Sequence, residues 1–222
     1  MSRRSQQHQL TKADIISGLD ELVRRAAGDS LTAEICVFGG GALAIADLRE
    51  STTVDVDSWI NAKKPVVDKI LAIGAAIGNE RGWERDWLNC EVAQFIPDEG
   101  EPFDWIPHAE VGSIRILLAP FDMLLAMKLR SNRPRDLGDV AGLVERCGVT
   151  TVQQALQIFE RYFSHDGPSD RARDWMEHNL QDRPPQPPVL WTTPVRDPAD
   201  VYIDTYITAD GDLVDGHWTS EE

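Results

Sequence analysis

Two neighbouring motifs have the residue types and spacing that chemistry on a phosphate group requires. Asp55 and Asp57 stand two positions apart in a β-branched stretch, and alternate residues of a strand point to the same face. Two carboxylates that converge in this way suit a hard cation such as Mg²⁺, which takes oxygen ligands and keeps substrate phosphates in its shell. Upstream, Gly39, Gly40 and Gly41 follow a short apolar run. Backbone N–H groups at a strand-to-helix turn hold anions, so the sequence predicts a phosphate site beside a metal site.

A basic segment further along the chain supplies side chains that could hold a phosphate. Lys128 ends an apolar helical stretch and presents a flexible point charge, and Arg133 and Arg135 follow closely. Asp136 then stands at the start of another predicted helix. Simpler roles stay open for all of them. Lys128 could be a solvated lysine at a helix end, Asp136 a helix N-cap, and the arginines members of surface ion pairs.

Local patterns predict the elements that must position these residues. Thr11 and Asp14 form a capping-box pattern at a helix start, and the stretch around Asp55 alternates polar with apolar residues as a strand does. Helices are predicted over residues 12–27, 42–46, 65–78, 120–129, 136–148, 152–163 and 169–180, and strands over residues 34–38, 52–60 and 113–118. Residues 79–112 are predicted to be irregular. This order predicts an α/β (α+β) fold, in which a small mixed β-sheet is flanked by helices and followed by a helical C-terminal part.

The last part of the chain is predicted to be a separate tail. Residues 184–188 are rich in proline and read as a semi-rigid linker, and residues 201–207 and 213–218 flank an Asp-Gly turn as a β-hairpin does. Because an isolated hairpin is marginal in water, we expect it to dock on its own body or on a second copy of the chain. The predicted units are a core over 10–130, a helical part over 131–183 and a tail over 184–222.

Composition limits the classes of protein that fit. The chain has 222 residues, 42% of them hydrophobic and 27% charged, which is typical of a folded domain. No apolar run approaches the roughly 18 residues of a membrane span, so no membrane insertion is expected. Three cysteines with no C-x-x-C pair suggest neither a disulfide framework nor a zinc site and fit a reducing cytoplasm. The formal net charge of −15 argues against a general nucleic-acid coat, and residues 184–222, with eight acids and one base, contribute −7 of it.

The motifs in combination resemble a known family. Residues 37–43, the Asp55-Val56-Asp57 motif, residues 124–129 and residues 133–139 are similar to the minimal nucleotidyltransferases of the polymerase-β-like superfamily. Within it they are most similar to the branch related to the AbiEii-type toxins of type IV toxin–antitoxin systems. The resemblance covers roughly residues 10–182. It implies a nucleotidyltransferase core in which Gly39 and Gly40 hold the nucleotide phosphates and Asp55 and Asp57 bind Mg²⁺.

The resemblance also implies roles for the basic segment and an activity. Lys128 would contact phosphate, with Arg135 beside it, and Asp136 and Asp139 would complete the site. The expected reaction moves a nucleoside monophosphate from a nucleoside triphosphate to an acceptor hydroxyl on tRNA, a protein or a small molecule. The expected setting is a toxin–antitoxin pair in the cytoplasm. Its partners would be a cognate antitoxin or a second copy of the chain that associates through the acidic tail.

A second interpretation of the same residues is a catalytically inactive nucleotidyltransferase-like module that binds a partner or acts as an antitoxin. It follows from the strand over residues 114–118, which contains no acid that could serve as the third carboxylate of the site. Glu91 and Asp104 are the nearest candidates. Binding of a nucleoside triphosphate with Mg²⁺ would distinguish the enzyme from the inactive module.

Two further patterns compete with these interpretations. Residues 39–44 also fit the dinucleotide fingerprint G-x-G-x-x-A, although the chain lacks the repeated strand–helix–strand units of a Rossmann fold. Arg173 and His178 form an R-x4-H pattern on a predicted helix, which resembles the ribonuclease motif of HEPN proteins. The helices over residues 152–180 are too few for the bundle that a HEPN domain needs.

Overall fold

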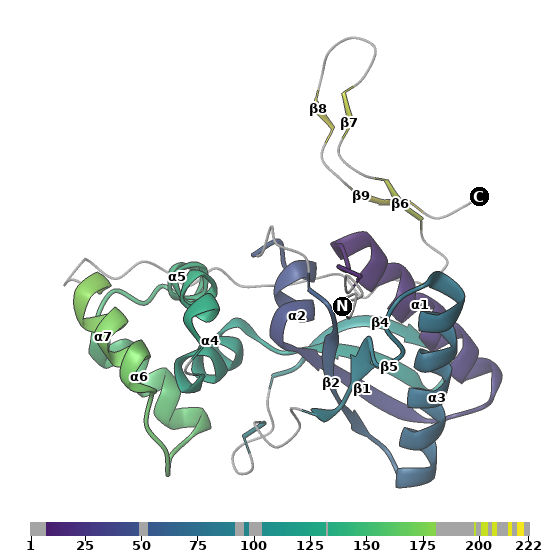
Figure 1. The fold of residues 1–222 in the computed structure, drawn as a ribbon, viewed down its shortest axis with the longest axis horizontal. Coiled ribbons are helices and arrows are strands. Elements are labelled where there is room, and N and C mark those ends of the chain that lie inside the picture. The colour runs from purple at the N-terminus through teal and green to yellow at the C-terminus, as the bar shows by residue number, and fades with distance from the viewer. Residues whose placement is uncertain are drawn as a thin grey trace, which may run out of the picture.

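The computed structural model describes residues 8–48, 53–91, 96–97, 104–131 and 133–180, together with Pro198 and the backbone of four short strands between residues 201 and 219. Within these residues the protein has a mixed α+β fold, which confirms the predicted fold class. Figure 1 shows a sheet with its covering helices on the right and a separate group of helices on the left.

A mixed five-stranded sheet forms the centre of the first part, with strand order β3-β2-β1-β5-β4. Its strands are β1 (Ala33–Phe38), β2 (Val56–Asn61), β3 (Leu88–Asn89), β4 (Ile106–Val111) and β5 (Ile114–Leu118). The central strand β1 runs antiparallel to β2 and parallel to β5, while β3 is parallel to β2 and β4 antiparallel to β5.

Two of these strands lie in the stretch that was predicted to be irregular. β3 has only two residues, too few for a period-two pattern to be recognised. β4 contains Pro107, a residue that is confined to edge strands or bulges, and its pairing with β5 shifts register between Pro107 and Ala109. The prediction of an irregular 79–112 is therefore wrong for both strands.

Helices α1 (Lys12–Gly28) and α3 (Lys64–Arg81) pack against each other beside the sheet. α1 begins at the predicted capping box, in which the side chains of Thr11 and Asp14 each bind the other's backbone N–H. Trp87 is fully buried, and its indole N–H donates to the Gly74 carbonyl of α3 at 2.7 Å. A β-carbon on Gly18 of α1 would lie 2.9 Å from the Trp87 ring, so glycine lets this indole lie close to α1.

The second part consists of helices that pack around α4. Its elements are α4 (Phe121–Arg130), the 3₁₀ turn η2 (Pro134–Asp136), α5 (Leu137–Arg146), α6 (Val152–Tyr162) and α7 (Asp170–Asn179). α4 contacts α5, α6 and α7, and its residues Leu124, Leu125 and Leu129 are buried. The backbone N–H of Ser169 donates to the Leu129 carbonyl, which fixes the start of α7 against the end of α4.

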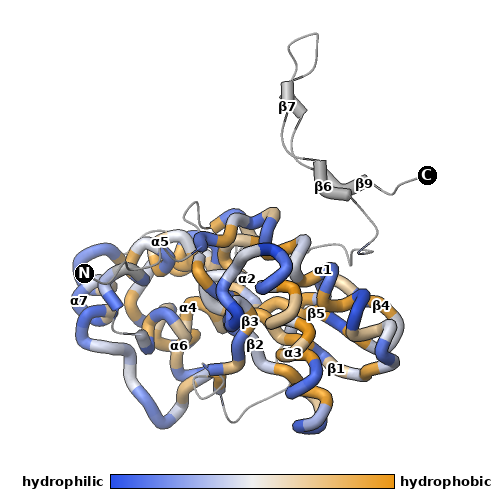
Figure 2. Tube along the Cα trace, turned by 45° about the vertical axis from the view of Figure 1, so that its right-hand side comes forward, coloured by the Kyte–Doolittle hydropathy of each residue, from blue (hydrophilic) through white to orange (hydrophobic). Residues whose placement is uncertain are grey.

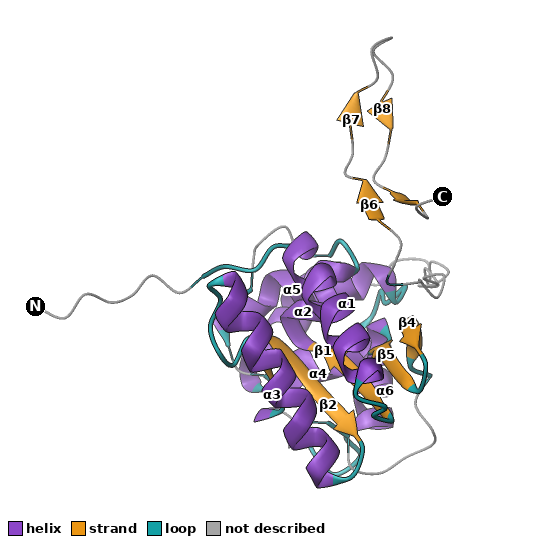
Figure 3. Ribbon diagram, turned by 90° about the vertical axis from the view of Figure 1, so that its right-hand side faces the viewer, coloured by secondary structure: helices purple, strands orange, loops and turns teal. Residues whose placement is uncertain are grey.

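Apolar residues gather where the sheet and the helices meet, as the orange segments of Figure 2 show. Figure 3 shows the strands of the central sheet surrounded by helices. Cys36, Cys90 and Cys147 are free thiols. None of the helices that the structure describes combines the length and the apolar character needed to cross a lipid bilayer.

The predicted hairpin of the tail is confirmed in its strand pairing. β6 (Val201–Ile203) pairs antiparallel with β9 (His217–Thr219), and β7 (Tyr206–Ile207) pairs antiparallel with β8 (Leu213–Val214). The linker over 184–188 and the turn over 209–212 lie outside the described residues. Docking of the hairpin on the body or on a second chain stays a prediction, as do the boundaries of the three predicted units.

Candidate active site

The two aspartates of the D-x-D motif lie at the start of β2, beside the end of β1. Asp57 is the second residue of β2 and is paired with Phe38, the last residue of β1. Asp55 stands just before the first strand residue, Val56, so the strand begins later than predicted. The Thr53 hydroxyl lies 3.1 Å from the Asp55 carbonyl and donates to it, which fixes the turn into the strand. The structure therefore brings the two carboxylates together at one end of the sheet.

The glycine turn lies directly against Asp57. Gly39 has φ +65°, a conformation that favours glycine, and a β-carbon on residue 39 would lie only 2.5 Å from Asp57 Oδ2. α2 (Gly39–Ile45) begins at this residue, and Phe38 at its N-cap makes no side-chain hydrogen bond to the first turn. The first N–H groups of α2 thus receive no capping hydrogen bond from Phe38, and Gly39 at the start of this helix lies next to the Asp57 carboxylate.

Asp57 is a half-buried carboxyl in an environment that disfavours its charge. Burial and the neighbouring charge of Asp55 raise the pKa of Asp57 to about 6, against opposing contributions from Arg133, Asn89 and Lys128. Two adjacent carboxylates that are only partly neutralised by the protein suit a bound cation. Mg²⁺ fits this donor set, because it is held in proteins by one or two carboxylates and takes its remaining oxygens from water and phosphates.

Asn89 is a member of this site that the sequence did not reveal. β3 pairs with β2 so that Asn89 lies beside Asp57, and Asn89 Nδ2 lies 3.5 Å from Asp55 Oδ2. Its Oδ1 accepts the Glu91 backbone N–H at 3.0 Å. The side chain next to the aspartates is thus an amide rather than the carboxylate of Glu91 or Asp104. Among the described residues no group of three or more His, Cys, Asp and Glu side chains is placed to hold a metal.

Lys128 is held in a buried ion cluster. Its Nζ lies 2.8 Å from Asp136 Oδ1 and 2.8 Å from Asp139 Oδ2, and the side chains of the lysine and the two acids are 12%, 5% and 8% exposed. Burial raises the pKa of Asp136, but hydrogen bonds from Lys128 and Ser131 outweigh it and bring the pKa below its usual value. Lys128 is therefore not a solvated lysine at a helix end.

Asp136 occupies the N-cap position of α5, but its carboxylate makes no capping hydrogen bond. Its Oδ2 instead accepts the Ser131 hydroxyl at 2.7 Å. Asp136 is therefore an ion-pair partner of Lys128 and not a side-chain N-cap. The carboxylate ties the end of α4 to the beginning of α5.

Arg133 is an exposed cation in this region. Its side chain is 54% exposed and lies 4.0 Å from Asp136 Oδ2, a weak ion pair, and its positive charge reaches Asp57. Arg133 thus presents an exposed positive charge near Asp57, while Lys128 is occupied by carboxylates. Arg135 lies in η2, but its side chain is outside the described residues, so its role stays a prediction.

Comparisons with known proteins do not assign a family to the chain. No protein-family model, curated protein or solved structure matches the chain. The resemblance to polymerase-β-like nucleotidyltransferases and AbiEii-type toxins therefore stays a hypothesis that rests on the residues described above.

The dinucleotide fingerprint does not have the strand arrangement that a Rossmann site needs. In that fold the glycine turn joins parallel strands through its helix, with the phosphates at the helix N-terminus. Here β1, α2 and β2 follow one another in the chain, and β2 runs antiparallel to β1. The alternative of a Rossmann dinucleotide site is therefore wrong.

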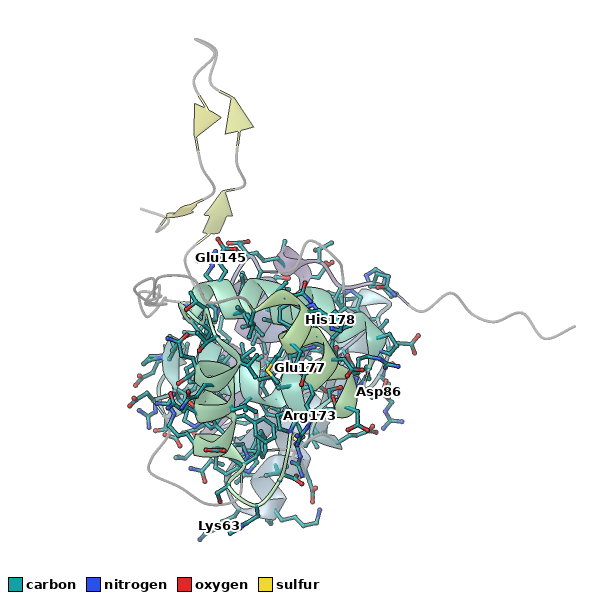
Figure 4. The ribbon with its side chains drawn as sticks, turned by 90° about the vertical axis from the view of Figure 1, so that its left-hand side faces the viewer. Lys63, Asp86, Glu145, Arg173, Glu177 and His178 are labelled. Carbon is teal, nitrogen blue, oxygen red and sulfur yellow. The ribbon has the colours of Figure 1, made fainter. Side chains whose placement is uncertain are left out.

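The R-x4-H pattern lies on α7, away from the aspartates in the fold. Figure 4 shows Arg173 and His178 toward opposite ends of this helix. Arg173 Nε donates to the Pro168 carbonyl at 3.1 Å, and His178 Nδ1 lies 2.6 Å from the Asp174 carbonyl. Each side chain is thus bound to a nearby backbone carbonyl, and the two side chains do not form one site.

Proposed function

We propose that the protein is a Mg²⁺-dependent nucleotidyltransferase, which transfers a nucleoside monophosphate from a nucleoside triphosphate to an acceptor hydroxyl. The observation that carries the proposal is the contact between the glycine turn and Asp57, in which a carboxylate oxygen occupies the space of a missing β-carbon on Gly39. A phosphate-binding turn and a paired-carboxylate cation site would be useful together only if one ligand spanned both, as a metal-bound triphosphate does.

Each residue has a role that its surroundings support. Asp55 and Asp57 would hold the metal, which when bound neutralises charge on the triphosphate and on the departing pyrophosphate. Asp57 must be ionised for this role, and with its pKa raised to about 6 it ionises only toward neutral pH. The backbone of Gly39 and Gly40 orients the phosphates, and Arg133 adds an exposed positive charge.

In this proposal the phosphate is not contacted by Lys128, Asp136 or Asp139. These residues instead hold a neighbouring segment in place. The two carboxylates hold Lys128 Nζ at 2.8 Å each, so the lysine fixes the segment that carries Arg133 relative to α4. The charge of Lys128 still reaches Asp57 and favours its ionised form. Lys128 is thus a positioning residue in this mechanism.

The transfer step follows the usual in-line course. The acceptor oxygen bonds to the α-phosphorus from the side opposite the leaving group, the bond between the α-phosphorus and the pyrophosphate oxygen breaks, and the hydroxyl proton passes to water. The products are the nucleotidylated acceptor, pyrophosphate and a proton. A tRNA, a protein or a small molecule can supply the hydroxyl, and a toxin–antitoxin setting with a cognate antitoxin belongs to this proposal.

The test is transfer of label from each α-labelled nucleoside triphosphate in the presence of Mg²⁺ and a cell extract. The Asp55→Ala/Asp57→Ala variant should lose transfer while it stays folded. A matched control replaces two exposed aspartates, Asp68 and Asp86, by alanine and should keep full transfer; Asp86 is labelled in Figure 4. Substantial transfer by the Asp55→Ala/Asp57→Ala variant would defeat the assignment.

The inactive binding module is the second candidate, and the amide of Asn89 favours it. Asn89 lies next to Asp57, where a further carboxylate would complete a larger metal site, and it is neutral. An inactive module has no need to bind a metal-bound triphosphate. Thermal stabilisation by a nucleoside triphosphate with Mg²⁺, absent in the Asp55→Ala/Asp57→Ala variant, would exclude this candidate.

A further inference from the structure

The segment between α2 and the D-x-D motif is held at both ends by residues at the start of α1. At one end, Lys12 Nζ lies 2.7 Å from each carboxylate oxygen of Asp47. At the other end, the Leu10 backbone N–H donates to the Thr53 carbonyl at 2.6 Å, and the Thr53 N–H donates to the Leu10 carbonyl at 3.2 Å. Residues 10–12 thus restrain the segment that leads to the aspartates.

Thr53 connects this support to Asp55. Leu10 is 1% exposed and belongs to the hydrophobic core, so the residue that pairs with Thr53 is itself fixed. Thr53 is 8% exposed, and its hydroxyl donates to the Asp55 carbonyl at 3.1 Å and lies 3.4 Å from Asp55 Oδ1. Because only one residue separates Thr53 from Asp55, a displacement of Thr53 would move the carboxylate.

α2 connects the other end of the segment to the glycine turn. This helix begins at Gly39, has seven residues and ends two residues before Asp47. Asp47 has φ +55°, a left-handed conformation that aspartate adopts more readily than most residues, and the chain leaves the helix there. The ion pair with Lys12 therefore restrains the far end of the helix whose first residue is Gly39.

We propose that Lys12 and Thr53 are positioning residues, which with Leu10 as their anchor hold Asp55 and the glycine turn at the separation that a metal-bound triphosphate needs. The role rests on the proposed function in one respect, namely that Asp55 binds a divalent cation. The two side chains act through Asp55 and α2. Removal of groups that orient metal ligands in this way weakens metal binding by about 10–100-fold.

The experiment measures the affinity of the full chain for Mn²⁺, a paramagnetic probe of the Mg²⁺ site, by electron paramagnetic resonance. Thr53→Val keeps the shape of the side chain but removes the hydroxyl, and it should weaken binding about tenfold. Thr53→Ser restores the donor and should bind Mn²⁺ as wild type does. Lys12→Met should weaken binding about threefold, because it removes one exposed ion pair and leaves Thr53 in place.

Two matched controls separate positioning from general loosening of the fold. Thr150→Val makes the same change at a threonine that is also 8% exposed and whose hydroxyl donates to Gln154 Oε1 at 3.2 Å. Lys64→Met removes a lysine from its ion pair with Asp68 on α3. Both control variants should bind Mn²⁺ as tightly as wild type.

The outcomes distinguish the positioning role from the proposed activity. Equal Mn²⁺ affinities of wild type and Thr53→Val, or an equal loss in Thr150→Val, would overturn the positioning role. If wild type bound Mn²⁺ no better than Asp55→Ala/Asp57→Ala, the metal site would be absent, and both the transfer and the positioning role would fall. Thr53-dependent Mn²⁺ binding by a protein that transfers no nucleotide would support the positioning role and overturn the proposed activity alone.

Discussion

Gly39 and Asp57 share one small volume, because the Asp57 carboxylate fills the space that a β-carbon on residue 39 would take. Gly39 is the first residue of α2, directly after the end of β1. Asp57 lies at the beginning of β2, which runs antiparallel to β1, and it is paired with the residue before Gly39. The turn that is suited to phosphates and the carboxylate that is suited to a cation are therefore not independent. A change at residue 39 acts on the position of Asp57.

Gly39→Ala should therefore lower the rate of nucleotidyl transfer strongly and the free energy of unfolding much less. The β-carbon would lie 2.5 Å from Asp57 Oδ2 and force the carboxylate aside, and a displacement of about 1 Å in an active site can cost about 100-fold in rate. Nucleotidyl transfer by the purified variant measures this loss.

Gly82 provides the matched control for that variant. It has φ +71°, close to the φ +65° of Gly39, but a β-carbon there meets no atom within 4 Å. Gly82→Ala should cost the same backbone strain, about 1 kcal/mol, and keep its transfer rate. If both variants lost transfer equally, strain rather than the contact with Asp57 would be the cause.

Asp57→Asn should stabilise the metal-free protein at high pH. The pKa of Asp57 is raised from its usual 3.8 to about 6, so the folded state holds the proton more tightly than the unfolded state does. Wild type consequently loses stability relative to the variant as pH rises from about 4 through 6. At pH 8 the variant should be more stable by on the order of 2–3 kcal/mol, and near pH 4 the two should agree. Urea unfolding in a chelator at several pH values measures the difference.

Asp68→Asn is the control for the pH series. Asp68 is an exposed member of an ion pair with Lys64 on α3, so its replacement should change stability by no more than about 0.5 kcal/mol at any of these pH values. A pH-independent difference between wild type and Asp57→Asn would contradict the burial and charge environment described for Asp57.

Lys128→Met should destabilise the fold severely. It would leave Asp136 and Asp139 buried at 5% and 8% exposure without their cation, and breaking a buried ion cluster in this way costs about 3–5 kcal/mol. Lys128→Met/Asp136→Asn should recover part of the loss, because one of the two uncompensated charges is removed. Unfolding free energies of the single and double variants give the comparison. A single variant as stable as wild type would mean that the cluster is solvated.

Asn89→Asp should change the response to metal. In a chelator the new carboxylate beside Asp55 and Asp57 should lower the melting temperature, because a third negative charge joins two that are only partly neutralised. With saturating Mg²⁺ the variant should gain more stability than wild type gains, by about 3 °C or more. Differential scanning calorimetry with and without the metal measures both effects.

Asn79→Asp, an exposed substitution on α3, should show no added response to Mg²⁺. If Asn89→Asp and Asn79→Asp responded alike, the position next to Asp57 would have no special access to a bound cation. A gain confined to Asn89→Asp would support Mg²⁺ at the D-x-D motif whether or not the enzyme is active.

The sequence by itself determined the features that depend on short stretches of chain. The capping box of Thr11 and Asp14 is a contact over three residues, and it starts α1 where predicted. The helices, the strands β1 and β5, the mixed fold class and the pairing of the tail hairpin follow from periodicity and turn chemistry in the same way. That the Asp55 and Asp57 carboxylates lie close together could be predicted from the alternation of side chains along a strand.

Only the tertiary structure decided which distant residues surround those aspartates. Asn89 reaches Asp57 through a two-residue strand, Lys128 is taken up by Asp136 and Asp139, and β2 runs antiparallel to β1. Periodicity reports whether a side chain is apolar and how it recurs, but it carries no information on which strands become neighbours or which charges meet. Those choices are made by burial and pairing across the whole chain, and they decide whether a motif becomes a site.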